Sequence, residues 1–173
     1  MATFVKPFAA WIPAAVGKYA ESMTAEPTII TCPNCATKNR VRPGAHGIPR
    51  CSICHTVLPW IVETDAGGFD EEITASVPVL VDFWAPWCGP CRMVSPVVEQ
   101  MGREFAGRLK VVKLDIDEAP AIASRYGVQG IPLLVVIIDG QEADRVVGAV
   151  PAGQLRVVLE RHVPESAPSQ RTR

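Results

Sequence analysis

The segment from Val77 to Trp84 is apolar except for one carboxylate, Asp82, and its length suits a strand buried within a sheet. It leads into Trp87-Cys88-Gly89-Pro90-Cys91, and the residues from Arg92 to Ala106 have the pattern of a helix. Pro90 suits the first turn of that helix, because its ring fixes φ there without removing a needed donor. The sequence therefore predicts a strand-to-helix junction with two cysteines where the helix begins.

A Cys-x-x-Cys pair at such a junction is typical of a dithiol that cycles with a disulfide. The thiolate is the reactive species, and a helix N-terminus favours it through backbone N–H groups and the helix dipole. Half of a zinc site has the same spacing. The preceding strand, the Gly-Pro dipeptide and the following helix favour redox chemistry for Cys88 and Cys91.

All six cysteines of the 173-residue chain fall into such pairs: Cys32/Cys35, Cys51/Cys54 and Cys88/Cys91. Structural disulfides gain most by closing longer loops, so tight pairs favour metal or redox chemistry and a reducing cytoplasm. The 17 basic and 18 acidic residues nearly balance, which does not indicate binding to nucleic acid or to an anionic membrane. No apolar run reaches the length of about 18 residues that would predict a transmembrane helix.

The first two pairs are separated by 15 residues, which is the spacing of a zinc ribbon. Each pair would offer two thiolates from a tight knuckle, and the loop between them would complete a tetrahedral site. That loop has too few apolar residues for a core, so metal would supply most of the folding energy. We predict one structural Zn²⁺ held by Cys32, Cys35, Cys51 and Cys54, with disulfides or free thiols as the alternative.

His46 and His55 are expected to be ordinary loop residues, because four cysteines already complete the site. The segment from Thr28 to Val62 contains basic residues and no acidic ones, which would partly offset the charge of a four-thiolate zinc site. A closed site leaves no position for substrate, so its role would be structural or regulatory, including release of metal on oxidation. Nucleic-acid binding is the weaker alternative, since Trp60 is the one aromatic residue nearby.

Residues Val81 to Cys91 (VDFWAPWCGPC) resemble the active-site segment of thioredoxins almost letter for letter. The resemblance extends from Trp60 to about His162. With the four-cysteine module, residues 28–162 are similar to the zinc-binding bacterial thioredoxins of the thioredoxin-2 type. This resemblance implies an α/β thioredoxin fold, in which a central mixed β-sheet is flanked by helices, preceded by a small four-cysteine zinc ribbon.

The pattern of elements agrees with that fold. We expect strands over 60–63, 77–84, 109–116, 133–138 and 143–147, and helices over 69–75, 92–106, 119–126 and 154–162. Pro96 should kink the long helix. The expected division is an N-terminal extension (1–27, flexible or preceding the true start), a zinc-ribbon module (28–58), a thioredoxin domain (59–163) and a disordered tail (164–173). A helical arm and an export signal are alternatives for the extension.

The resemblance implies roles for several residues. Cys88 would be the nucleophile and Cys91, the less exposed cysteine, would resolve the mixed disulfide. Asp82 is flanked by apolar residues, so burial should raise its pKa and allow it to accept the Cys91 proton. Lys113 matches the lysine that accompanies this aspartate in the family; a solvated strand lysine is the alternative.

Other residues match the substrate face of the family. Ile131-Pro132 would carry a cis peptide bond, and the Ile131 backbone would pair with an extended substrate segment. Leu133 stands where threonine is usual. Positions that would frame the bound substrate are Trp87, Gly89, Pro90, Ile131, Pro132 and Gly148.

The implied activity is reduction of protein disulfides, with an NADPH-dependent thioredoxin reductase as electron donor and no bound organic cofactor. The chain would be a cytoplasmic monomer that binds neither nucleic acid nor membrane. Two alternatives remain: a zinc-dependent redox sensor or chaperone-like binding module, and an exported disulfide oxidant or isomerase.

Overall fold

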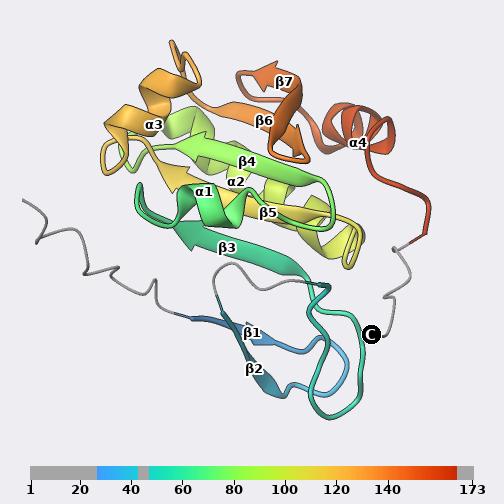
Figure 1. Ribbon diagram of the computed structural model, residues 1–173. Coiled ribbons are helices and arrows are strands. Elements are labelled where there is room, and N and C mark those ends of the chain that lie inside the picture. Colours follow the sequence, from blue (N-terminus) through green and yellow to red (C-terminus); the bar gives the residue numbers. More distant parts are fainter. Residues whose placement is uncertain (1–26, 43–46, 167–173) are drawn as a thin grey trace, which may run out of the picture.

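The computed structural model describes residues 27–42 and 47–166 (Figure 1). The expected N-terminal extension, apart from Pro27, lies outside the described residues, as do His46 and residues 167–173 of the expected tail. Within the described ranges, no helix combines the length and the apolar character needed to cross a bilayer.

The described chain has seven strands and four helices. They are β1 (Thr28–Thr31), β2 (Lys38–Val41), β3 (Trp60–Thr64), α1 (Phe69–Glu72), β4 (Val79–Trp84), α2 (Gly89–Glu104), β5 (Lys110–Asp115), α3 (Pro120–Arg125), β6 (Leu133–Ile138), β7 (Gln141–Val147) and α4 (Ala152–Glu160).

Five strands form one mixed sheet in the order β3-β5-β4-β6-β7. The first three are parallel, and β6 and β7 are antiparallel to their neighbours. Side chains alternate along β4, so Val79, Val81 and Phe83 pack beside α1 and α3, whereas Leu80 packs beside α2 and α4. Helices therefore cover both faces, which confirms the predicted α/β fold (Figure 1).

Each strand and helix expected from Trp60 onward is present, with shifted ends. The long helix α2 begins at Gly89, because Cys88 serves as its N-cap, and α1 ends at Glu72 rather than Ala75. Pro96 lies inside α2. After α4, Val163 is buried in the core and Arg108 donates to the carbonyl oxygens of Pro164 and Glu165, at 3.1 and 3.2 Å.

Strand β7 forms one edge of the sheet and carries mostly exposed side chains, three of which are charged. Arg145 forms an ion pair with Glu142 at 2.6 Å, and Asp144 contacts Arg161 and His162, each at 3.0 Å. The β6–β7 register shifts between Val136 and Ile137. At the turn between the two strands, Asp139 and Gly140 both have positive φ, as a two-residue hairpin turn with the sequence Asp-Gly requires.

The four-cysteine segment within residues 28–58, called the N-terminal module below, lies beside the opposite edge, next to β3 (Figure 1). Its antiparallel β1–β2 hairpin was not predicted, because the two strands are short and largely polar. Ile30, Val41, Ile48 and Leu58 join the same buried cluster as Trp60 and the α1 face of the sheet. The module thus shares a core with the larger domain, and this packing adds stabilisation that its own composition did not suggest.

A buried ion pair fixes α1 to the sheet. Lys110 at the start of β5 contacts Glu72 of α1, and both side chains are almost fully buried. The Lys110 ammonium also lies 4.5 Å from the ring centroid of Trp60. Because removal of one partner would leave a buried charge unpaired, this contact holds α1 against the first residues of β3 and β5.

The turn between α2 and β5 touches the N-terminal module at Gly107. This glycine has φ +77°, and a Cβ atom there would lie 2.6 Å from Val57 Cγ1 and 3.3 Å from Ile48 Cγ2. A glycine is therefore required both by the backbone and by the close approach of the module.

We expect Gly107→Ala to lower the free energy of unfolding by about 2–4 kcal/mol, since it adds a steric clash to an unfavourable φ. Gly140→Ala is the matched control, because Gly140 has φ +75° and open space around its Cβ position. The control should cost only about 1–2 kcal/mol. Chemical denaturation at equal metal content measures both values, and equal losses would show that the module does not press against Gly107.

Candidate redox site and four-cysteine cluster

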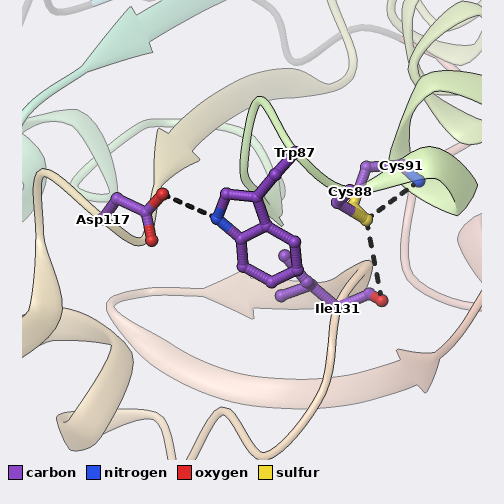
Figure 2. Close-up of a disulfide and its surroundings, with 5 residues drawn as sticks. All are labelled: Trp87, Cys88, Cys91, Asp117 and Ile131. Carbon is purple, nitrogen blue, oxygen red and sulfur yellow. Dashed lines mark hydrogen bonds between the residues drawn. A yellow bond between two sulfur atoms is a disulfide. The ribbon is translucent and has the colours of Figure 1, made fainter.

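Cys88 and Cys91 form a disulfide where β4 leads into α2, with 2.00 Å between the sulfurs and 5.3 Å between the Cα atoms. Cys88 is the N-cap residue of α2, and its sulfur accepts a hydrogen bond from the Cys91 N–H at 3.1 Å (Figure 2). Pro90 occupies the first turn, as predicted. A thiolate on Cys88 would therefore meet a backbone donor and the positive end of the helix dipole.

The two cysteines are buried to the same extent, each with 3% of its surface exposed. The expectation that Cys91 is less exposed is not met in this disulfide form. Their surroundings do differ. The Cys88 sulfur lies 3.8 Å from the Ile131 carbonyl oxygen, whereas Cys91 lines a pocket of about 180 Å³ with Trp84, Arg92, Ser95, Pro96 and Glu99.

The expected substrate residues surround the disulfide. Trp87 is 65% exposed, and Figure 2 shows its indole beside Cys88. The Ile131–Pro132 bond is cis, and the Gly148 N–H donates to the Pro132 carbonyl at 2.8 Å. Gly89 and Pro90 are exposed at the start of α2. Trp87, Gly89 and Pro90 are thus exposed beside the disulfide and Ile131 is half-buried, whereas Pro132 itself is buried.

The sequence did not indicate Asp117. Its Oδ2 accepts a hydrogen bond from Trp87 Nε1 at 2.7 Å (Figure 2). Its own N–H donates to Asp115 Oδ1 at 2.9 Å. Asp117 thereby orients the exposed indole. An aspartate in a loop 30 residues from its partner gives no local pattern that would reveal this contact.

Asp82 lies in the middle of the sheet and is 2% exposed. Its Oδ1 has no hydrogen-bond partner among the described residues. Burial raises the pKa of its carboxyl from 3.8 to about 7, and the positive charge of Lys113 opposes this shift. Lys113 stands directly opposite Asp82 on β5, where the sequence placed it. Asp82 is thus a buried carboxyl in the middle of the sheet that can exchange a proton at neutral pH.

The raised pKa has a consequence for stability. Below about pH 4 Asp82 is protonated in both the folded and unfolded chain, but between about pH 4 and 7 only the folded chain keeps the proton. The neutral Asp82 carboxyl therefore contributes stability that is fully present below about pH 4 and is lost as the pH rises through the folded pKa near 7.

In oxidised protein, the stability of Asp82→Asn relative to wild type should rise by about 4 kcal/mol between pH 4 and pH 8. Urea denaturation across this range provides the measurement. Glu160→Gln, at an exposed carboxylate, controls for the change in net charge. A difference between Asp82→Asn and wild type that does not vary with pH would contradict the raised pKa.

The other four cysteines converge in the N-terminal module. Their sulfurs all lie within 4.8 Å of one another, with Cys32 and Cys54 3.5 Å apart and Cys35 and Cys51 3.4 Å apart. Tetrahedral coordination at about 2.3 Å would place sulfurs about 3.8 Å apart. With small adjustments the four sulfurs could therefore hold one tetrahedral metal ion, and a four-thiolate set of this geometry suits Zn²⁺ or an iron–sulfur centre.

The two knuckles have the same backbone structure. In each, the first cysteine N–H donates to a threonine carbonyl at 2.8 Å, Thr37 in one and Thr56 in the other. The residue after the second cysteine, Ala36 or His55, has φ near +60°. That conformation turns the chain back, so both sulfurs of a pair face the other pair. His55 is exposed and is not part of the sulfur cluster.

Asn39 connects the two knuckles, and no pattern in the sequence indicated this role. The buried side chain donates to the Thr37 carbonyl at 2.9 Å and accepts from the N–H and hydroxyl of Ser52, at 2.9 and 3.1 Å. Because it bonds to residues of both knuckles, Asn39 fixes the distance between the two cysteine pairs.

The thiols of this cluster differ in acidity. Hydrogen bonds from the Thr56 and Asn34 side chains lower the pKa of Cys54 to about 5, whereas burial raises the pKa of Cys32 to about 11. Binding of a metal to all four sulfurs must therefore displace a proton from Cys32 at least.

Comparison with known proteins supports the redox site. The family model described as thioredoxin matches residues 50–161. Thioredoxin 1 of Synechococcus elongatus is 52% identical over 100 residues, which cover 58% of this chain and 94% of that protein. The chloroplastic M-type thioredoxin of Chlamydomonas reinhardtii is 38% identical over 135 residues, covering 74% and 91% of the two chains.

A solved structure agrees with these relatives. A mutant thioredoxin from Halobacterium salinarum NRC-1 superposes with a TM-score of 0.58 at 35% sequence identity. The match covers 62% of this chain and 95% of that one.

Proposed function

Because the chain belongs to the thioredoxin family and is therefore a protein-disulfide reductase, we propose that Cys88 and Cys91 carry out the reduction. The observation that carries this assignment is the Cys88–Cys91 disulfide at the N-terminus of α2, with the Cys88 sulfur as helix cap. In the reduced protein this cap would favour the Cys88 thiolate.

The reaction begins when the Cys88 thiolate attacks one sulfur of a substrate disulfide, which forms a mixed disulfide and releases the other sulfur as a thiolate. Asp82 takes the proton of the Cys91 thiol. The Cys91 thiolate then attacks the Cys88 sulfur, the second substrate sulfur leaves, and the Cys88–Cys91 disulfide forms. Two electrons have passed to the substrate. A thioredoxin reductase would return the protein to its dithiol form.

The surface around the disulfide would hold the substrate. Its backbone would pair with Ile131 beside Pro132, in the manner of an added strand. Trp87 would provide an exposed aromatic contact, fixed by Asp117, and Gly89, Pro90 and Gly148 would leave room for the substrate chain.

Two variants separate the proposed roles of the cysteines. Cys88→Ser and Cys91→Ser should each lower turnover in a reductase-coupled disulfide-reduction assay by at least about 1000-fold, since each removes a sulfur needed for the cycle. Only Cys91→Ser should accumulate a mixed disulfide with substrate, seen as an added mass under non-reducing conditions. Accumulation in Cys88→Ser instead would reverse the assignment.

We also propose that Cys32, Cys35, Cys51 and Cys54 bind one structural Zn²⁺ and that residues 28–58 form the zinc ribbon, followed by the thioredoxin domain over 59–163. The convergence of four sulfurs from two equivalent knuckles supports this assignment. Four thiol groups that are not joined in disulfides also suit a reducing compartment such as the cytoplasm. The proposed working form is a monomer without an organic cofactor.

Native mass spectrometry should find one zinc per wild-type chain and none in Cys32→Ser. Asn39→Ala should lose zinc to a competing chelator about 10–100-fold faster, because Asn39 fixes the knuckles around the metal. Lys38→Ala, at an exposed neighbour on the same strand, is the control. Equal retention by the two variants would show that Asn39 does not support the site.

The ribbon could also sense oxidants, because Cys35 is exposed and oxidation of its sulfur would release the metal. If disulfide reduction is the main role, Cys88→Ser should abolish the biological function and Cys32→Ser should not. The reverse result would favour the sensor. A Cys88–Cys91 potential far above that of glutathione would favour a disulfide oxidant.

A further inference from the structure

Three charged side chains stand in one row across the sheet. Glu63 on β3 is in register with Lys113 on β5, which is in register with Asp82 on β4. Residues in register on neighbouring strands project to the same face, so all three lie on the face that α2 covers. The row continues with the apolar Leu134 on β6.

The row runs from solvent into the core. The Glu63 side chain is 70% exposed, that of Lys113 is 11% exposed, and Asp82 is buried. Lys113 Nζ lies 3.2 Å from Glu63 Oε1 and 5.3 Å from the centroid of the Trp84 ring. Asp82 Oδ1 has no hydrogen-bond partner among the described residues. The ammonium is thus bonded to the edge-strand carboxylate rather than to the buried one.

Among the described residues, the other elements around Asp82 place no second cation in contact with its carboxyl group. Leu134 on β6 is uncharged, and Cys91 on α2 is part of the disulfide. The charged residues of α2 on this side, Arg92 and Glu99, line the pocket beside Cys91 and Trp84. Lys113 is the charge that acts on Asp82, and it opposes the effect of burial on the Asp82 pKa.

We propose that Glu63 is a positioning residue for the resolving step, because it holds the Lys113 ammonium at the edge of the sheet and leaves Asp82 free to accept a proton at neutral pH. The inference rests on the proton-accepting role proposed above for Asp82. Glu63 acts through Lys113 and touches neither substrate nor sulfur.

Loss of the Glu63 carboxylate has two effects on the Asp82 pKa, and both lower it. The released ammonium can turn toward Asp82, and a cation within about 4–6 Å stabilises a carboxylate. The nearby negative charge of Glu63 also disappears, which makes ionisation of Asp82 easier. Both effects lower the Asp82 pKa and weaken it as a base for Cys91.

The direct test is a carbon-13 NMR titration of the Asp82 carboxyl in oxidised full-length protein, where Cys88 and Cys91 do not titrate. The wild-type midpoint should lie near pH 7, and Asp82→Asn identifies the signal by removing it. Glu63→Gln should lower the midpoint by about one pH unit. Lys113→Met should raise it, and adding Glu63→Gln to Lys113→Met should produce only a small further change.

Glu104→Gln is the matched control, because Glu104 also forms an exposed ion pair, with Arg156 at 2.7 Å, and the variant loses the same charge. Its midpoint should equal that of wild type. A midpoint that is the same in Glu63→Gln and Glu104→Gln would overturn the inference and leave the proposed reductase mechanism untouched.

A second measurement tests the link to the reaction. Reduced protein is mixed with the aromatic disulfide 5,5′-dithiobis(2-nitrobenzoate), and release of the second thionitrobenzoate reports attack by Cys91. The pH dependence of this step should shift with the midpoint in Glu63→Gln and stay unchanged in Glu104→Gln. If the midpoint moves but the rate profile does not, the proton-accepting role of Asp82 is wrong, and the positioning role of Glu63 in the resolving step falls with it.

Discussion

Backbone pairing of β4 with β5 on one side and β6 on the other determines where every reactive group of the redox site lies. The strand is buried on both faces, and its end leads directly to Cys88. Because side chains alternate along a strand, this register puts Asp82 on the face covered by α2, the helix whose first turn contains Cys91. It also aligns Lys113 and Glu63 with Asp82. A slip of one residue would exchange the faces and move Asp82 away from the side that α2 covers.

The sequence predicted the parts of this site that depend on local pattern. An apolar strand, a Cys-x-x-Cys pair and an amphipathic helix are contiguous, so the junction and the fold from Trp60 onward could be inferred. Contacts between distant polar residues could not. Asp117, Asn39 and the buried Lys110–Glu72 pair resemble ordinary surface residues in the sequence. Their contacts are with partners that only the tertiary fold brings close. Nothing in the sequence around Lys110 shows that its side chain is buried.

The three cysteine pairs have identical spacing, but their sulfurs meet different partners, because the backbone of the Cys88/Cys91 pair differs from that of the other two pairs. Ala36 and His55 have positive φ and turn the chain back, so the sulfurs of each knuckle face the opposite knuckle. Gly89 and Pro90 instead begin a helix, and the two sulfurs of that pair meet each other. The knuckles also depend on their surroundings: Ile30, Val41 and Leu58 pack into the core of the larger domain.

The two edges of the sheet are protected in different ways, which bears on how the protein avoids aggregation. An exposed edge strand offers unpaired backbone groups to a strand of another chain. The N-terminal module stands beside the β3 edge. Strand β7 has no neighbouring strand on its outer side. Its register shift and its charged side chains, Glu142, Asp144 and Arg145, oppose such pairing. An incoming strand would have to desolvate these three ionised groups. If a substrate pairs with the Ile131 backbone as proposed, the protein can present backbone at that one place without offering the edges of its sheet for polymerisation.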